Sequence, residues 1–366
     1  MTARLLRRTP LLSWLVLLLA LLAGTQPALA SHLLGGELTY KYLDATGPTT
    51  APYRYEITAS VYVTCSSSAT ASYLDIDFYN KATGAQYTIT STNAGSTNAS
   101  AYGGALELTQ SSISPCTTIA VPPGCTITGA SQPYQLQKFI GVVCLPTSTA
   151  GFYAVTAPSG NRNAGINNIG NSSSSSYYMG LYAALLPASI PNRSPVFTGD
   201  AVGLICAGDT TVILNNAVDP DGDRLVYSFG QPYGTVDGLG ILPQFSFTPP
   251  PPILGYTPGF GYSAATPFGT TTGNFAELDA ASGIAKYSST KVGAKYAVAV
   301  DVSEYRTVNG QEVLIGTTRR DLQLVVASCP TTKTPVLPPV AVLPRNYTVE
   351  AGSSLTIPIT TKMIIQ

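Results

Sequence analysis

Hydrophobic and polar residues alternate along much of the chain after residue 30. In residues 53–65, Tyr, Ile, Ala, Val and Cys fill the odd positions, and Arg, Glu, Thr and Ser fill the even positions up to residue 60. Residues 37–43, 73–79, 295–306 and 313–329 show the same period of two. Such a period places successive side chains on opposite faces of a β-strand. The pattern therefore predicts strands, and no segment after residue 30 has a convincing helical period.

Turn-forming residues separate the predicted strands. Asn309-Gly310 predicts a tight hairpin, because both residues tolerate a positive φ. Residues 159–176, SGNRNAGINNIGNSSSSS, have no core pattern, so we expect a long flexible surface loop there. Residues 248–262 contain a run of prolines that cannot donate to a sheet, and we expect a second surface loop. Many short strands with such turns predict an all-β fold of antiparallel sandwiches.

The arrangement of the strands predicts two tandem antiparallel β-sandwiches. We expect the first in residues 31–190 and the second in residues 191–330, with the break in PASIPNRSPVF. Residues 331–366 begin with a proline-rich linker and continue as the opening strands of a partial third sandwich. A segment of that length cannot bury a sandwich core, so it is either the truncated start of a further domain or a disordered tail.

The first residues indicate export. Arginines within the first eight positions precede the apolar run LLSWLVLLLALLAG, and Ala28 and Ala30 stand where a signal peptidase requires small residues. The apolar run is short for a bilayer span of about 20 residues. We therefore predict that residues 1–30 are a cleaved signal peptide and that no later segment spans a membrane. The mature chain would lie outside the cell or on its outer surface, with the periplasm as an alternative.

Charge and composition narrow the function. Charged residues make up 10% of the chain, against about 25% in typical soluble proteins, and the formal net charge is zero. Nucleic-acid binding needs a clustered basic surplus, which is absent from this sequence. Tyr outnumbers Phe by 22 to 10, which favours sheet faces where the ring packs and the hydroxyl reaches water.

The six cysteines are candidates for disulfide bonds in an oxidising compartment. None lies in a C-x-x-C pair, so zinc binding is not expected. A Cys206–Cys329 bond would join the first strand of the second domain to its last. The cysteines of the first half should bridge among themselves, with the pairing left open; they are Cys65, Cys116, Cys125 and Cys144.

Several of these segments resemble one family of exported proteins. SHLLGGELTYKYL and YRYEITASVYVTC resemble the start of large secreted proteins of Bacteroidota, which often end in a gliding-motility-associated C-terminal domain for type IX secretion. NRSPVF, AVDPDGDRLVYSF and VLIGTTRRDLQLVV resemble the cadherin-like or immunoglobulin-like repeat that follows. The resemblance implies a non-enzymatic surface protein of β-sandwich modules. The sorting domain itself does not occur in the sequence, which leaves the export route and the surface attachment open.

The acidic stretch AVDPDGDRLVYSF has two interpretations. Asp219, Asp221 and Asp223 alternate with Pro220 and Gly222, and this composition is typical of a tight turn. Three carboxylates within five residues also repel one another unless a cation or solvent separates them, and Ca²⁺ prefers such oxygen ligands. The spacing excludes an EF-hand. The sequence thus leaves open either an acidic turn or a calcium site.

The resemblance to cadherins suggests which residues would hold calcium. Asp219 and Asp221 would join Asp301, a later strand aspartate, and Asn192, with Asp223 adding an oxygen. The fit to the cadherin pattern is incomplete, because Ile190 and Pro191 stand where cadherins carry acidic residues.

Residue chemistry argues against catalysis. His32 is the only histidine, which nearly excludes a catalytic triad or a zinc protease motif. The carboxylate pairs Glu304 with Asp301, and Glu37 with Glu56, could serve a glycosidase, but each falls in an alternating strand where an outward charge is the ordinary explanation. Arg319-Arg320 before Asp321 is interpreted as a strand-end salt bridge.

The sequence therefore predicts a secreted or cell-surface, non-enzymatic structural or adhesion protein, which calcium would stiffen if the acidic stretch is a metal site. Its partners would be other surface proteins or extracellular polysaccharide. Two alternatives stay open: a polysaccharide-binding module or an accessory part of a glycoside hydrolase, and a truncated fragment of a longer surface protein. Aromatic rings aligned on one exposed face would favour the polysaccharide alternative.

Overall fold

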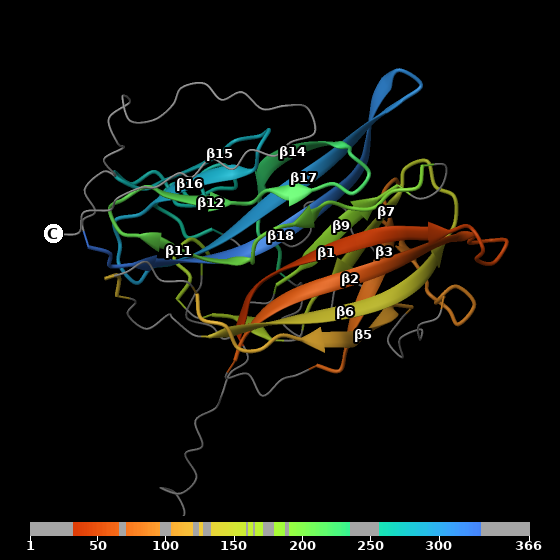
Figure 1. Cartoon of the computed structure of the whole chain (residues 1–366), viewed down its shortest axis with the longest axis horizontal. Helices are drawn as coiled ribbons and strands as arrows, with labels where there is room; N and C mark the ends of the chain where they lie inside the picture. The colour runs from red at the N-terminus through yellow and green to blue at the C-terminus, as the bar shows by residue number, and fades with distance from the viewer. Residues whose placement is uncertain are drawn as a thin grey trace, which may run out of the picture.

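The computed structural model contains only β-strands in the residues that it describes (Figure 1). Those residues are 32–65, 71–95, 104–119, 124–126, 133–158, 160–163, 165–170, 179–186, 190–234 and 256–330. Within these ranges no helix is long and apolar enough to cross a membrane. The predicted all-β sandwich fold is confirmed. The predicted signal peptide, residues 248–255 of the proline-rich loop and residues 331–366 lie outside the described residues.

Strands β1 to β9 form the N-terminal half of the described chain, and strands β10 to β18 form the C-terminal half. The N-terminal strands are β1 (His32–Asp44), β2 (Tyr53–Thr64), β3 (Tyr73–Asn80), β4 (Gln86–Tyr87), β5 (Leu106–Ile113), β6 (Tyr134–Leu145), β7 (Phe152–Thr156), β8 (Asn161–Arg162) and β9 (Leu181–Leu185). The C-terminal strands are β10 (Val196–Phe197), β11 (Val202–Cys206), β12 (Thr211–Leu214), β13 (Ala217–Val218), β14 (Arg224–Gly230), β15 (Phe275–Leu278), β16 (Ile284–Ser288), β17 (Lys295–Val308) and β18 (Gln311–Ala327).

The period-two segments lie in the long strands. In β2 the residues at odd positions from Tyr55 to Val63 are buried, as the alternation predicts, and they belong to one apolar cluster with Leu38, Ile76 and Phe139. That cluster is built entirely from the N-terminal half. A second cluster contains Tyr296 and the valines of β17, and most of its members come from the C-terminal half. The two clusters therefore divide near the predicted domain boundary.

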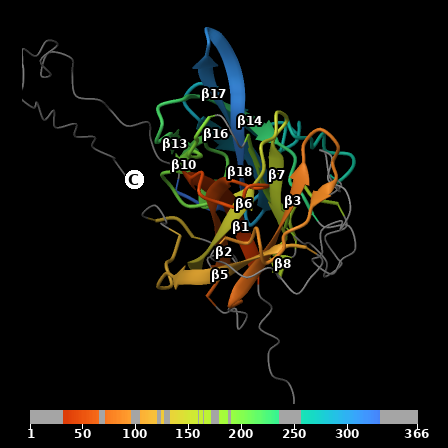
Figure 2. The ribbon, with the colours of Figure 1, turned by 90° about the vertical axis from the view of Figure 1, so that its right-hand side faces the viewer.

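The strand pairing, by contrast, runs across this boundary. One 13-stranded sheet contains eleven strands in the order β14-β17-β18-β9-β7-β3-β5-β6-β2-β1-β8, with β4 paired to β3 and β11 paired to β18. In addition β18 pairs with β1, through Gly35↔Leu322 and Glu37↔Arg320. Because β17 occupies one edge of β18, both β9 and β1 lie on its other edge. The two ends of the N-terminal sheet thus meet on the last long strand of the C-terminal half, and the layers close around it (Figures 1 and 2).

Close backbone approach explains the glycines of β1. A Cβ atom at Gly35 would lie 2.5 Å from the backbone oxygens of Ala201 and Asp321, and one at Gly36 would lie 2.7 Å from the Leu181 side chain. No side chain fits at such distances, so glycine is required where β1 crosses between β2, β9 and β18. The sequence motif GGE therefore marks the junction of the two halves.

The β17–β18 hairpin is the longest in the fold. Asn309 and Gly310 both have positive φ, 52° and 77°, which confirms the predicted turn. The hairpin is the long blue ribbon that rises from the body in Figures 1 and 2. Its pairing extends from Lys295↔Val325 at the base to Val308↔Gln311 at the tip, with one irregularity at Glu304 and Tyr305.

The predicted flexible loop at residues 159–176 is wrong in its described part. Arg162, Asn168 and Ile169 are almost fully buried, and Asn161–Arg162 forms β8, parallel to β1. The Asn168 side chain donates to the carbonyls of Pro267 and Ala297 and accepts from the Ala297 N–H. The polar composition of this segment predicts exposure to solvent. In the structure, however, the polar side chain of Asn168 satisfies buried backbone groups of the other half.

Two disulfide bonds are present among the described residues. Cys206–Cys329 joins β11 to the end of β18, as predicted, and Cys65–Cys116 joins the ends of β2 and β5. The expectation that all four cysteines of the N-terminal half bridge among themselves is not met, because Cys125 and Cys144 are free thiols. Cys144 is buried inside β6, and Cys125 lies beside the C-terminal disulfide.

Candidate functional site

The acidic stretch forms a turn between β13 and β14. Asp219 Oδ1 accepts hydrogen bonds from the backbone N–H groups of Asp221, at 2.9 Å, and Asp223, at 2.8 Å. Gly222 has a φ of 81°, which only glycine adopts without strain. One aspartate therefore organises the turn, as the simpler interpretation of the sequence predicts.

The other two aspartates are bound by arginines. Asp221 accepts from the backbone N–H of Arg193 at 2.7 Å, and its Oδ1 accepts from the guanidinium of the same residue at 2.7 and 2.9 Å. Asp223 accepts from Nε and Nη2 of Arg306 at 2.7 and 2.5 Å, and its side chain is 4% exposed. Burial opposes ionisation of Asp221, but the hydrogen bonds from Arg193 prevail and lower its pKa.

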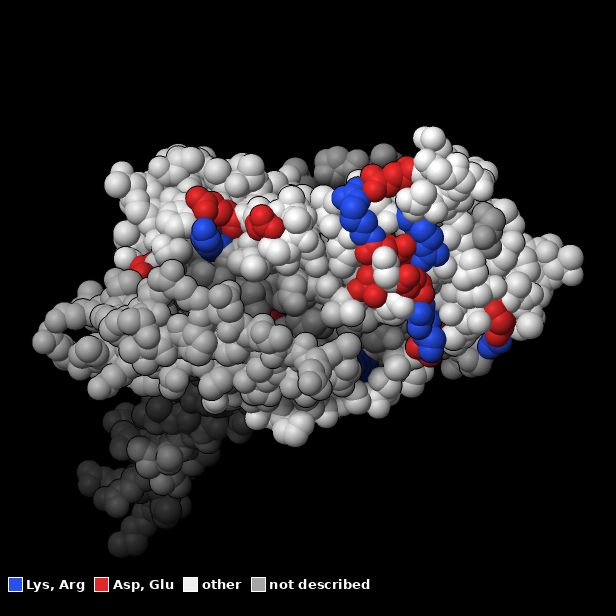
Figure 3. All heavy atoms as spheres, turned by 45° about the horizontal axis from the view of Figure 1, so that its top comes forward, with Lys and Arg blue, Asp and Glu red and all other residues white. Residues whose placement is uncertain are grey.

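Arg306 also contacts the chain that joins the two halves. Its Nη1 donates to the carbonyl of Pro191 at 2.8 Å, and its Nη2 donates to Asn192 Oδ1 at 2.9 Å. Nη2 lies 3.4 Å from Asp221 Oδ2 as well. One guanidinium of β17 thus binds oxygen atoms from the acidic turn and from the inter-half segment. The face in Figure 3 shows the surroundings of such pairs: acidic and basic side chains gather in a compact band, and most of the remaining surface carries neither.

A buried glutamate lies behind the turn. Glu304 of β17 is fully buried, and its carboxylate accepts from Asn192 Nδ2 at 2.5 Å and from the Tyr40 hydroxyl at 3.2 Å. Carboxylate atoms of Asp219, Asp223 and Glu304 lie within 4.8 Å of one another. Burial raises the pKa of Glu304 to about 8 and also raises the pKa of Asp219.

These contacts do not fit a calcium ion on the predicted ligands. Ca²⁺ takes six to eight oxygen atoms, as a rule. The carboxylates of Asp221 and Asp223 already accept hydrogen bonds from Arg193 and Arg306 on both of their oxygen atoms. Asp219 Oδ2 is the one buried oxygen of the turn without a hydrogen-bond partner. Calcium binding is therefore not supported by the donor set.

The fourth predicted ligand, Asp301, belongs to a different cluster. It forms a bidentate pair with Arg319 on the neighbouring strand, with both N–O distances at 2.6 Å. The Arg319 guanidinium lies over the rings of Tyr182, at 4.8 Å, and Tyr233, at 4.1 Å. The two neighbouring tyrosine rings both stabilise the cation. The structure therefore brings the three turn aspartates together but not Asp301.

Three consecutive charged residues in the middle of β18 have three separate partners. Arg319 pairs with Asp301 of β17, Arg320 donates to Glu37 of β1 at 2.7 Å, and Asp321 binds Arg162 of β8 through two hydrogen bonds, at 2.6 and 2.5 Å. The predicted strand-end salt bridge is wrong, because these residues lie mid-strand and are nearly fully buried. They connect β18 to the strands that meet on it.

The predicted outward orientation of the candidate acids is also wrong. Glu37 is 7% exposed and Glu304 is 0% exposed. Glu37 lies on the polar phase of β1, which is buried here as well, whereas Glu304 shares its parity with Val300 and Val302 and interrupts the apolar phase of β17. In β18 the sequence does carry a signal of buried charge, because RRD directly precedes the largely apolar LQLVVA. A buried charge requires a partner of opposite sign.

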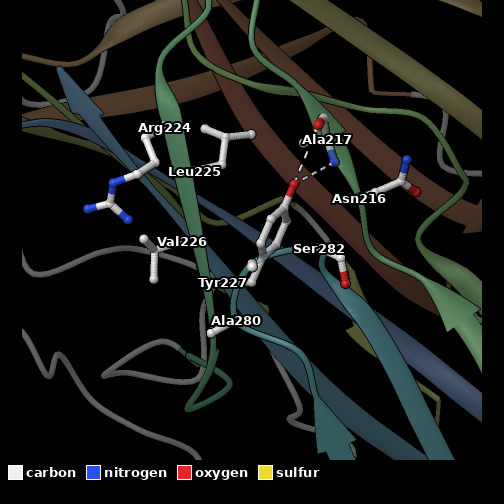
Figure 4. Close-up of a pocket in the computed structure, with 9 residues that line it drawn as sticks. Asn216, Ala217, Arg224, Leu225, Val226, Tyr227, Ala280 and Ser282 are labelled. Atoms are coloured by element: carbon white, nitrogen blue, oxygen red, sulfur yellow. Dashed lines mark hydrogen bonds between the residues drawn. The ribbon is translucent and has the colours of Figure 1, made fainter.

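Two depressions in the described surface carry no paired acids. The larger, of ≈ 560 Å³, lies beside β14 and is lined largely by small or apolar groups, with Arg224 as its one ionisable acid or base apart from Tyr227. Figure 4 shows the Tyr227 ring crossing this space toward Ala217, whose N–H donates to the tyrosine hydroxyl at 2.9 Å. The second, of ≈ 330 Å³, contains Glu56 as its only carboxylate. Glu37 and Glu56 therefore do not form a site together.

Comparison with known proteins gives distant structural similarity alone. No family model matches the chain, and no curated protein matches it. A solved structure of the two tandem V-type regions of VCBP3, a v-region-containing chitin binding protein, is similar at 10% identity and a TM-score of 0.31. The match covers 79% of this chain and 99% of that chain. A match this distant defines neither the topology nor a ligand of this chain.

Glu304 is expected to make stability depend on pH. Its pKa is about 8 in the folded chain and near 4.5 when unfolded, so the folded state holds a proton that the unfolded state loses in between. The contribution of Glu304 to stability should be fully present below pH ~4.5 and should be lost as pH rises through about 8, by up to roughly 5 kcal/mol at 1.36 kcal/mol per pKa unit. Urea unfolding at several pH values measures this slope.

The matched variant is Glu304→Gln, which keeps the shape of the side chain and cannot ionise. Its stability should fall less than that of the wild-type chain between about pH 5 and pH 8, because the group with the largest raised pKa is gone. Some fall should remain, because the pKa of Asp219 is also raised. Parallel slopes for the two proteins would contradict the assignment.

Proposed function

We propose that the chain is an exported, non-enzymatic protein of the cell surface, in which the two halves act as one rigid structural or adhesive unit. The observation that carries this proposal is the double use of β18, which belongs to the C-terminal hairpin and also receives both ends of the N-terminal sheet. A chain joined in this way transmits force through hydrogen-bonded strands rather than through a linker.

Ion pairs support the same proposal. Arg162–Asp321 and Arg320–Glu37 each connect one half to the other and are almost inaccessible to water. Removal of either partner would leave an uncompensated charge, so the halves cannot separate at low cost. Rigidity would then come from arginine–carboxylate pairs within the chain, with no requirement for calcium.

The distribution of aromatic rings favours this structural role over polysaccharide binding. Among the described residues most Tyr and Phe side chains are buried in the cores, for example Phe268, which stacks on Tyr296 at 4.1 Å. Tyr73 and Phe260 are the aromatic residues with large exposed fractions, 44% and 52%. They belong to different halves of the fold, whereas a sugar platform needs neighbouring exposed rings.

The proposal is tested in two steps. Thermal unfolding of the full chain, followed by far-ultraviolet and near-ultraviolet circular dichroism, should show one transition common to both signals. Protease treatment of intact source cells should release peptides of this protein, and deletion of its gene should weaken attachment or cell–cell contact. Two separate transitions would contradict the rigid unit.

Co-sedimentation with polysaccharide tests the alternative function. Binding that Phe260→Ala or Tyr73→Ala abolishes would support a polysaccharide-binding module.

A further inference from the structure

Three sulfur atoms meet at the end of the fold from which residues 331–366 continue. Cys206 ends β11, and Cys329 follows β18; the disulfide between them has a Cα–Cα distance of 5.4 Å. The Cys125 Sγ lies 4.0 Å from the Cys206 Sγ, and all three sulfur atoms lie within 4.8 Å of one another. A free thiol is therefore in van der Waals contact with a disulfide.

The backbone holds Cys125 in this place. Thr126 and Ser328 exchange two hydrogen bonds, at 2.7 and 3.0 Å, as an antiparallel bridge. On the other side of Cys125, Gly124 lies against Pro330, at a distance where an added Cβ would touch the proline ring. The residues on both sides of the thiol thus contact the residues on both sides of Cys329, one by a β-bridge and the other by packing. These two contacts hold the sulfur atoms together.

We propose that Cys125, Cys206 and Cys329 form a thiol–disulfide exchange site with two disulfide isomers. The Cys125 thiolate attacks the Cys206 Sγ, a Cys125–Cys206 bond forms, and the Cys206–Cys329 bond breaks. Cys329 leaves as a thiolate and takes up a proton, in place of the one that Cys125 gave to solvent. One thiol and one disulfide are present before and after, so the step needs no oxidant or reductant.

Exchange moves the reactive thiol along the chain. In one isomer the free thiol is on Cys125, and in the other it is on Cys329, 204 residues later in the sequence. All three cysteines are partly exposed, so either thiol is accessible to a thiol reagent, whereas Cys144 is 2% exposed. Burial raises the pKa of the Cys125 thiol, so the attacking thiolate is scarce near neutral pH and exchange should be about tenfold faster for each pH unit toward that pKa.

Disulfide mapping of the full chain tests the proposal. The protein is purified without reductant, incubated at about pH 7 or about pH 8, blocked with N-ethylmaleimide and digested with pepsin under acidic conditions that prevent further exchange. The expected result is a Cys125–Cys206 peptide beside the Cys206–Cys329 peptide, with N-ethylmaleimide on both Cys329 and Cys125, and an appearance rate about tenfold higher at the higher pH. Cys65–Cys116 serves as the internal control and should show a single pairing.

Two variants distinguish whether Cys125 can form a bond with Cys206 from whether the wild-type chain exchanges its disulfide spontaneously. Cys329→Ser with oxidised glutathione should link Cys125 to Cys206, as glutathione is reduced to two thiols, whereas Cys125→Ser should show only Cys206–Cys329. If Cys125 and Cys206 stay unlinked in Cys329→Ser, the proposed geometry is overturned. If they link in that variant but the wild-type chain keeps Cys206 bonded to Cys329 alone after prolonged incubation, spontaneous exchange is overturned.

Discussion

Replacement of Asp321 by asparagine is expected to destabilise the folded chain by about 3–5 kcal/mol. Asp321 and Arg162 have side-chain exposures of 0% and 1%, and two short hydrogen bonds join them. The variant keeps the shape of the side chain but leaves the Arg162 guanidinium charged and without its counter-ion in a water-free site. The free energy of unfolding from urea denaturation measures the effect.

The surface pair Arg224–Glu312 is the matched control. Its side chains are 53% and 50% exposed, and its N–O distance of 2.7 Å is as short as those of the buried pairs. Glu312→Gln should cost less than about 1 kcal/mol, because water screens and replaces the lost interaction. A loss for Asp321→Asn no larger than that of Glu312→Gln would show that the buried pair does not hold the halves together.

Replacement of Arg306 by glutamine is expected to cost about 2–4 kcal/mol and to create a dependence on calcium that the wild-type chain lacks. Without the guanidinium, Asp223 loses both of its charge-assisted hydrogen bonds. Asp223 then lies beside the carboxyl groups of Asp219 and Glu304, and Arg193 remains bound to Asp221. The oxygen atoms of Asp223, Asn192 and Pro191 become free at the same time. These are the hard ligands that Ca²⁺ prefers.

Thermal unfolding with and without calcium checks this second prediction. A concentration about 100 times the dissociation constant should restore about 2.7 kcal/mol in Arg306→Gln and leave the wild-type midpoint unchanged. Arg224→Gln, which removes an exposed arginine of the neighbouring strand, should show neither the loss nor the rescue. An equal calcium shift in the wild-type chain would mean that the arginines do not replace the cation.

The disulfides and the acidic turn show how far local sequence could predict the site. The turn geometry follows from Asp, Pro and Gly themselves, and the Cys206–Cys329 pairing follows from the positions of the first and last strands. The arginine partners could not be predicted in this way. Arg193 and Arg306 are 28 and 83 residues from the aspartates that they bind, and nothing in the local pattern distinguishes them from solvent-exposed charges.

The alternation in β1, β17 and β18 predicted strands correctly but assigned the wrong environment to their polar residues. Glu37 occupies the polar phase of β1 and is buried because that face is covered as well, whereas Glu304 and Arg320 interrupt the apolar phase and are buried with it. A period of two states which side chains share a face and does not state whether the other face meets water.

The sequence by itself determined the secondary structure: the positions of the long strands, the Asn309-Gly310 hairpin and the acidic turn, because these depend on side-chain alternation and on residues that adopt particular backbone angles. Only the tertiary structure decided that β1 and β9 meet on one edge of β18, that Arg162 lies inside the fold, and that Cys125 touches the C-terminal disulfide. Those contacts join residues that are far apart in the chain, and they depend on how the layers close over one another.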